Sequence, residues 1–238
     1  MRMKNRNPGT PGQAGCAIPD APLWDRTGVR RVMASMLLEL VAVVLVMLFL
    51  ALLVLPALMG TGTKCAPRIN CVNNLKQIGV AARTWALDYS NAYPASLPIA
   101  LGGAKESVEA GAAFRWFQVL SNELMTPWIV VCPSDTRARA TNFGAGFSNT
   151  NVSYFVGLDA ADTMPNMYLS GDRNLTNGTT PRNGILALSS NSVAGWTHQL
   201  HQFQGNVALA DGSVQEFSNS GLKADVAASG CTNRLAMP

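Results

Sequence analysis

An uninterrupted run of apolar residues near the N-terminus constrains this chain more than any other feature. The run extends from Leu40 to Met59 and directly follows a single glutamate, Glu39. Its twenty residues, at ~1.5 Å of rise each, make a helix of roughly 30 Å, which is enough to cross the hydrocarbon core of a bilayer. With 238 residues, of which 48% are hydrophobic, the chain is long enough for one membrane helix and one globular domain of moderate size.

The charged residues are distributed unevenly about this run. Residues 1–34 hold six of the 18 basic residues and two of the 14 acidic ones, so the whole excess charge of +4 precedes the run. This positive-inside pattern predicts a basic cytoplasmic leader (1–34) and a single-pass protein of the inner (cytoplasmic) membrane, with the C-terminal domain outside. A nucleic-acid partner is not expected, because the globular part has no net positive field.

The five cysteines divide along the same boundary. Cys16 lies in the predicted leader, whereas Cys65, Cys71, Cys132 and Cys231 follow the apolar run. On the exported side disulfides persist, and four cysteines allow three pairings between which the sequence does not choose. Burial of unpaired cysteines as small apolar side chains is an equally good interpretation.

Three interpretations of the N-terminus follow from these features. A cleaved secretory signal peptide has a shorter apolar core and an Ala-x-Ala site, and the end of this run, residues 55–59, offers none. A plain signal anchor explains the length and orientation, with Glu39 at the cytoplasmic interface. In the third interpretation Glu39 has a function, since a carboxylate at the mouth of a membrane helix is costly.

The segments 35–44 (SMLLELVAVV) and 55–58 (LPAL) resemble the N-terminus of the type IV pilin and pseudopilin family. In that family a prepilin peptidase cuts after a basic leader, and the new N-terminus is methylated. Glu is the fifth residue of the mature family member, and Pro is typically the twenty-second. Counting Ser35 as the first mature residue places Glu39 and Pro56 at these positions.

Two residues at the expected cleavage site differ from the family pattern. Ala34 stands where the family has Gly, and Ser35 stands where it usually has Phe. The resemblance implies a transmembrane prepilin-like helix over 35–59, cut between Ala34 and Ser35 by a prepilin peptidase. It also implies that Glu39 sets the register between subunits, and that other pilin-like subunits and inner membrane lipid are partners.

Beyond the apolar run the sequence predicts a break, a second helix and an α+β domain. Glycine and proline in 60–67 favour an end or a kink, and apolar spacing predicts a stalk helix from Ile69 to Tyr89 within 60–92. The exported α+β domain (93–238) is expected to form a small antiparallel β-sheet of pilin-like type. Its expected elements are a helix at 114–120, strands at 128–132, 152–156 and 184–188, and a long surface loop at 159–183 with one strand at 167–169.

The clearest hairpin pattern lies near the C-terminus. Residues 206–217 form two strand-like segments around Asp211-Gly212, a pair that favours a tight two-residue turn because it tolerates positive φ. His201 precedes the aspartate by ten positions. This His-x9-Asp-Gly spacing, together with the segment 68–79 (RINCVNNLKQIG), resembles a large bacterial group of pseudopilin-like proteins whose individual roles are largely unassigned.

The sequence carries no familiar catalytic or metal-binding signature. HExxH, GxSxG and CxxC patterns are absent. His201 is expected to hydrogen-bond to the hairpin or a neighbouring loop and not to act with Asp211 as a catalytic pair, so neither an enzyme nor a cofactor is predicted. The acidic residues of the C-terminal loops lack EF-hand spacing, which favours solvated carboxylates over a Ca²⁺ site. These residues are Asp159, Asp162, Asp172 and Asp211.

The favoured function is therefore a structural subunit of a type II secretion or type IV pilus-like filament. Two others are compatible with the sequence. An uncleaved membrane-anchored module would use the loop at 159–183 to bind a glycan or a protein and would not enter a filament. A hydrolase without a recognisable motif would depend on His201 or Asp211.

Overall fold

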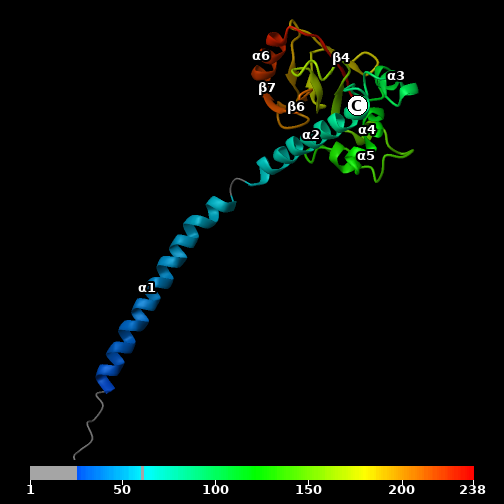
Figure 1. The fold of residues 1–238 in the computed structure, drawn as a ribbon. Helices are drawn as coiled ribbons and strands as arrows, with labels where there is room; N and C mark the ends of the chain where they lie inside the picture. Colours follow the sequence, from blue (N-terminus) through cyan, green and yellow to red (C-terminus); the bar gives the residue numbers. More distant parts are fainter. Residues whose placement is uncertain (1–25, 60–61) are drawn as a thin grey trace, which may run out of the picture. The chain divides into compact units, whose positions relative to one another are not determined.

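The computed structural model describes residues 26–59 and 62–238 (Figure 1). The chain divides into two compact units, Met1–Met59 and Gly60–Pro238.

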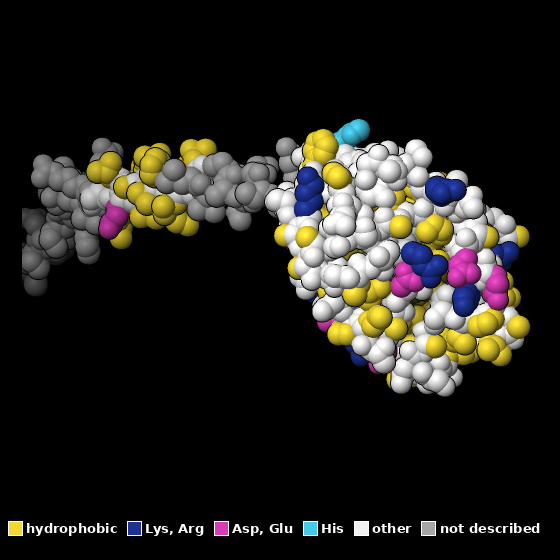
Figure 2. Space-filling model, turned by 90° about the horizontal axis from the view of Figure 1, so that it is seen from above, with side chains coloured by type: hydrophobic (Ala, Val, Ile, Leu, Met, Phe, Trp, Pro, Cys, Tyr) yellow, Lys and Arg dark blue, Asp and Glu magenta, His cyan; other side chains and the backbone are white. Residues whose placement is uncertain are grey.

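The first unit contains a single described helix, α1 (Arg26–Met59). Within it, the segment Ser35–Leu52 has no buried side chain, and Figure 2 shows its largely hydrophobic surface. Among the described helices, α1 is the one that is long and apolar enough to cross a membrane. The helix begins at Arg26, so the described part of the predicted leader is already helical and continuous with the apolar run.

The second unit combines one long helix, α2, and several short helices with an antiparallel sheet. Its α-helices are α2 (Gly62–Asp88), α3 (Lys105–Glu109), α4 (Phe114–Val119), α5 (Ser121–Leu124) and α6 (Asn219–Ser229). Its 3-10 helices are η1 (Ile99–Leu101), η2 (Pro127–Val130) and η3 (Asn149–Asn151). The fold of this unit is therefore α+β, as the sequence predicts.

The main sheet has six strands in the order β4-β8-β1-β2-β6-β7, and all of its pairs are antiparallel. These strands are β1 (Tyr154–Gly157), β2 (Tyr168–Asp172), β4 (Ile185–Leu188), β6 (Gln204–Leu209), β7 (Val214–Ser218) and β8 (Asn233–Ala236). A separate pair consists of β3 (Leu175–Thr176) and β5 (Gly195–Trp196).

Each face of the main sheet supports its own hydrophobic core. Successive side chains of a strand point to opposite faces, so Tyr154 and Val156 of β1 join the core under α2, whereas Phe155 joins the core under α6. The same alternation separates Ala208 from Val207 in β6. The central strands are consequently buried on both sides, which explains the low polarity of the segment 154–157.

The stalk helix forms but begins earlier than expected. α2 starts at Gly62 and not near Ile69, and it contains Pro67. A proline in the second turn removes one N–H donor without ending the helix. Residues 60 and 61, where the break is also predicted, lie outside the described residues. The predicted apolar stripe is correct from Leu75 onwards, but Ile69 is exposed and Cys71 occupies the buried position in the preceding turn.

Two sequence predictions within the domain are wrong. The expected strand at 128–132 begins as the 3-10 helix η2, because Pro127 starts it and the Thr126 side chain accepts a hydrogen bond from the Trp128 N–H. The expected surface loop at 159–183 contains two strands: the predicted strand at 167–169 is the beginning of the longer β2, every residue of which is buried, and β3 was not expected. Burial between β1 and β6 overrides the weak strand propensity of residues 170–172.

Other predicted elements are confirmed. The helix at 114–120 is α4, and the strands at 152–156 and 184–188 are β1 and β4. The C-terminal hairpin is β6–β7. Its turn differs in detail: Gly212 donates a hydrogen bond to the Leu209 carbonyl, and among the turn residues only Gly212 has a positive φ, of 86°. The connection is thus a type I turn followed by a left-handed glycine, in place of a two-residue turn.

Candidate functional site

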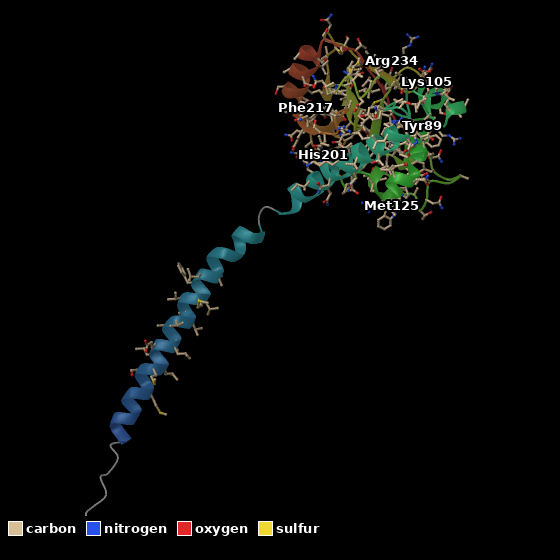
Figure 3. All side chains as sticks on the ribbon, viewed as in Figure 1. Tyr89, Lys105, Met125, His201, Phe217 and Arg234 are labelled. Atoms are coloured by element: carbon tan, nitrogen blue, oxygen red, sulfur yellow. A yellow bond between two sulfur atoms is a disulfide. The ribbon has the colours of Figure 1, made fainter. Side chains whose placement is uncertain are left out.

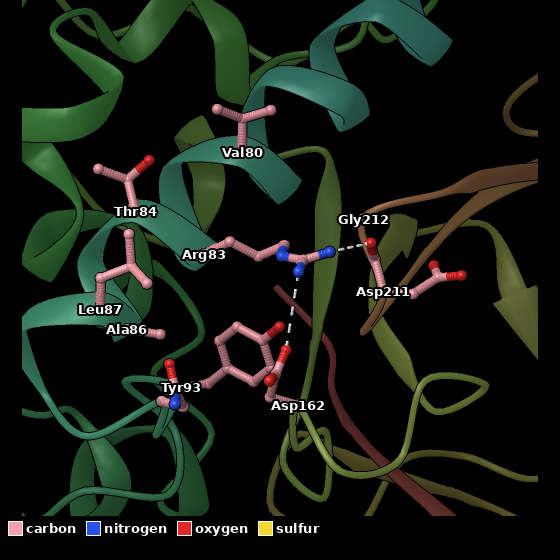
Figure 4. Close-up of a pocket in the computed structure, with 10 residues that line it drawn as sticks. Val80, Arg83, Thr84, Ala86, Leu87, Tyr93, Asp162, Asp211 and Gly212 are labelled. Atoms are coloured by element: carbon pink, nitrogen blue, oxygen red, sulfur yellow. Dashed lines mark hydrogen bonds and ion pairs between the residues drawn. The ribbon is translucent and has the colours of Figure 1, made fainter.

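The turn of the C-terminal hairpin packs directly against α2. A Cβ atom added to Gly79 of α2 would lie 3.6 Å from the Cα of Gly212, so the two backbones approach closely here. Arg83 donates a hydrogen bond to the carbonyl of Asp211 and forms a 3.9 Å ion pair with Asp162 (Figure 4). The two segments that carry the pseudopilin-like resemblance, 68–79 and the His-x9-Asp-Gly stretch, are therefore in contact.

A second set of contacts holds the beginning of this stretch. Arg68 of α2 donates one hydrogen bond to the carbonyl of His201 (3.2 Å) and another to Glu216 Oε1 (2.7 Å). His201, Gln202 and Phe203 have positive φ values of 50°, 53° and 63°. Three successive non-glycine residues in this conformation are unfavourable, so the surrounding contacts must impose it. Figure 3 labels His201 beside α2.

The His201 imidazole is buried against polar and sulfur groups. Its Nε2 atom is 3.5 Å from Asp172 Oδ2 and 3.4 Å from the Sγ atom of Cys132. Cys132 is joined to Cys71 of α2 by a disulfide, which is one of the three pairings that the sequence leaves open. The side chains of His201 and Asp172 are 3% and 0% exposed. The four residues come from four different segments of the second unit.

Burial shapes the protonation of this pair. It lowers the pKa of His201, and the positive charge of Arg68 lowers it further. Burial also raises the pKa of Asp172 to about 7, although hydrogen bonds from the backbone and side chain of Asn206 oppose the increase. Both shifts favour the neutral forms. The pair is therefore held by polar contact more than by full opposite charges.

The two polar residues of the predicted motif have different partners. The carboxylate of Asp211 is exposed and accepts a 2.8 Å hydrogen bond from the N–H of Ser213. His201 instead contacts Asp172, which sequence reasoning placed among solvated loop carboxylates. That placement is wrong because Asp172 ends a buried strand. Extending the predicted strand at 167–169 by three residues would have brought Asp172 into the sheet.

The remaining acidic residues considered for Ca²⁺ are also engaged separately. Asp159 forms a 2.6 Å ion pair with Arg234, whereas Asp162 faces Arg83. Each of these carboxylates thus has its own partner within the described chain.

The predicted processing residues lie in α1. Ala34, Ser35 and Pro56 fall within this one continuous helix, and the described side chain of Glu39 is exposed. Of the two other exported cysteines, Cys231 is exposed and outside any disulfide, and the side chain of Cys65 lies outside the described residues.

The outer face of α2 carries apolar side chains that the domain does not cover. Val80 and Leu87 are 65% and 75% exposed, and Thr84 lies between them on the same face. A hollow of about 540 Å³ toward the Asp-Gly turn flanks this face. Another of about 510 Å³, toward α5 and η2, flanks its other side and includes Met125 in its lining. We call Val80, Thr84, Leu87 and Met125 the α2 outer face.

Comparison with known proteins gives no assignment: the chain matches no protein-family model, no curated protein and no solved structure.

Proposed function

We propose that this protein is a pseudopilin-like structural subunit of a type II secretion or type IV pilus-like filament. The observation that carries the proposal is the composition of α1: a helix with an exposed apolar segment, Ser35–Leu52, in which Glu39 is the single charged residue. A lone carboxylate in such a segment is costly at lipid depth unless it has a partner. The family resemblance around Glu39 and Pro56 indicates which group this partner is.

That partner is a new N-terminus. Cleavage between Ala34 and Ser35 by a prepilin peptidase creates a positive amine at the end of the membrane helix. Glu39 of one subunit then neutralises the amine of its neighbour when the helices pack side by side. A charge pair in low dielectric is favourable only when both members are present, so it selects one register between subunits more than it adds stability.

The globular domain offers a matching lateral surface. The α2 outer face is largely apolar, combines Val80, Thr84 and Leu87 of α2 with Met125 at the end of α5, and has hollows on both sides. Exposed apolar side chains grouped in this way are typical of protein–protein contacts. Other pilin-like subunits are the proposed partners, with inner membrane lipid around α1. The cytoplasmic leader and the exported domain follow from the charge pattern, and the Cys71–Cys132 disulfide is compatible with an oxidising compartment.

The N-terminus of the protein isolated from its native membrane tests this proposal. Intact mass and terminal sequencing are expected to give a chain that begins at N-methylated Ser35. An Ala34→Gly variant, which restores the family residue, should be cut at least as completely. A chain that retains Met1 in both forms would contradict the proposal and favour a permanently anchored binding module.

Assembly provides an independent measurement. In membranes treated with a crosslinker, Glu39→Ala should lose the ladder of crosslinked subunits, and Val80→Asp should weaken it. Ile99→Asp is a matched control, because Ile99 is an exposed apolar residue outside the α2 outer face. Equal ladders in all four proteins, wild type included, would refute a filament role for these residues.

A further inference from the structure

Four groups with metal-binding chemistry converge beneath the left-handed turn. They are the sulfurs of Cys71 and Cys132, the carboxylate of Asp172 and the imidazole of His201, whose ligand atoms all lie within 4.8 Å of one another. Two sulfurs, one nitrogen and one oxygen form a ligand set that suits zinc. In the disulfide-bonded form the sulfurs are not thiolates, so the set is incomplete.

A second observation points to a missing ligand. Asp172 is completely buried, and its Oδ1 atom has no hydrogen-bond partner within the described chain. The other oxygen, Oδ2, accepts hydrogen bonds of 2.8 and 2.9 Å from the backbone and side chain of Asn206. A buried acceptor without a partner is unfavourable, and the fixed second oxygen holds the carboxylate in place.

The spacing of these groups already approaches that of a coordination site. Metal–ligand distances of about 2.0–2.3 Å in a tetrahedral zinc site put neighbouring ligand atoms roughly 3.3–3.8 Å apart. His201 Nε2 lies 3.4 Å from Cys132 Sγ. It lies 3.5 Å from Asp172 Oδ2, the oxygen that Asn206 already holds, so a bound metal would take the unpartnered Oδ1 of the same carboxylate. The two sulfurs are closer than this because they share a covalent bond. Breaking that bond lets them separate to the distance that the site requires.

We propose that reduction of the Cys71–Cys132 disulfide converts this cluster into a zinc site with Cys71, Cys132, Asp172 and His201 as ligands. A dithiol reductant supplies two electrons and two protons: the S–S bond breaks, two thiols form, and the reductant becomes a disulfide. Zinc then displaces the two thiol protons, together with the proton of a neutral Asp172 carboxyl, into solvent and takes both thiolates and the carboxylate. Disulfide and zinc are thus alternative links between the same segments.

Contacts around the site support this exchange. Two thiolates and one carboxylate exceed the zinc charge by one, and Arg68, which also forms a 2.7 Å ion pair with Glu216, lies beside the site with a 3.2 Å hydrogen bond to the His201 carbonyl. The same hydrogen bond fixes the turn that positions the imidazole. Asn206 likewise holds the Asp172 carboxylate in place by donating a 2.9 Å hydrogen bond to its Oδ2 atom. Such supporting contacts typically orient zinc ligands.

The test uses full-length protein in detergent with Cys16, Cys65 and Cys231 replaced by serine. The protein is reduced with a dithiol, freed of the reductant under argon, and titrated with Co²⁺ as a spectroscopic probe. The expected result is one Co²⁺ per chain, with thiolate-to-metal charge-transfer absorption and the visible bands of a tetrahedral site. Zn²⁺ should remove both signals, and the oxidised protein should show neither.

Ligand variants separate this site from adventitious binding. His201→Ala and Asp172→Ala should each weaken Co²⁺ binding by more than about tenfold, and the milder His201→Gln and Asp172→Asn serve where circular dichroism shows a misfolded alanine variant. Asp159→Asn, a carboxylate change at a different ion pair, should bind as the parent does. Absence of the charge-transfer band in the reduced protein, or equal affinity of the ligand variants, would overturn the proposal.

Discussion

The hydroxyl of Tyr93 donates a 2.6 Å hydrogen bond to the carbonyl of Ala210, 117 residues further along the chain. Both residues are buried. Tyr93 follows the end of α2, and Ala210 opens the Asp-Gly turn of the hairpin. This bond therefore ties the β6–β7 hairpin to the segment that follows α2.

Removal of this hydroxyl should destabilise the domain measurably. In Tyr93→Phe the Ala210 carbonyl remains buried without its partner, so the free energy of unfolding should fall by about 1–2 kcal/mol. Urea unfolding followed by tryptophan fluorescence measures it. Tyr89→Phe is the matched control, because the Tyr89 ring stacks on Trp85 and its hydroxyl makes no hydrogen bond within the described chain. Equal stability of the two variants would contradict the assigned role.

The Cys71–Cys132 disulfide should contribute more than any single hydrogen bond. It closes a loop with a sequence separation of 61 residues, for which chain entropy predicts about 4 kcal/mol. The Cys71→Ala/Cys132→Ala double variant should lose this amount in urea unfolding with a chelator present. Cys231→Ala, which removes an exposed thiol outside any disulfide, should change stability by less than about 0.5 kcal/mol. A double variant as stable as the wild type would show that the disulfide is dispensable.

The parts of the fold that the sequence predicted are those governed by local pattern. The apolar run gives α1, and the three- and four-residue spacing gives most of α2. The parts that it missed are governed by neighbours distant in sequence. Residues 170–172 are small or polar, yet pairing with β1 and β6 makes them a buried strand. The valines and isoleucine of 128–132 favour a strand, yet Pro127 opens a 3-10 helix.

The same distinction applies to the candidate site. The spacing from His201 to the Asp-Gly turn is visible in the sequence, and the structure brings that turn onto α2. The partner of His201 is not visible, because Asp172 reaches it only through the order of strands in the sheet. The disulfide joins α2 to Cys132, which follows η2, for the same reason, and local pattern could not choose that pairing.

Asp211 should give the hairpin turn a dependence on acid pH. Hydrogen bonds from the side chain and backbone of Ser213, followed by the charge of Arg83, lower the pKa of Asp211. A folded-state pKa below the unfolded value contributes stability above the unfolded pKa of about 4, and this contribution is lost as pH falls through the folded value. Besides Arg83, the ionisable groups near the turn are Asp162 and Tyr93.

Asp211→Asn keeps an oxygen that accepts the Ser213 N–H but removes the titration. Its melting temperature should therefore decrease less than that of the wild type between about pH 5 and pH 3. The difference should be small because the Asp211 side chain is exposed. Asp88→Asn, at an exposed position at the end of α2, is the control and should follow the wild type. Parallel curves for Asp211→Asn and the wild type would contradict the assigned pKa direction.

Gly157 should be among the least replaceable residues of the sheet. It ends β1 at a point where an added Cβ atom would overlap the carbonyl oxygen of Tyr168 in the neighbouring strand. Backbone on both sides of this contact belongs to paired strands and cannot move without breaking the ladder, so Gly157→Ala should cost at least 1–3 kcal/mol, roughly the range for an overpacked core. Gly146→Ala is the matched control because nothing lies within 4 Å of its added Cβ. Thermal unfolding of both variants measures the cost of the added methyl group. If Gly157→Ala is as stable as Gly146→Ala, β1 and β2 are not packed as closely at Gly157 as the sheet requires.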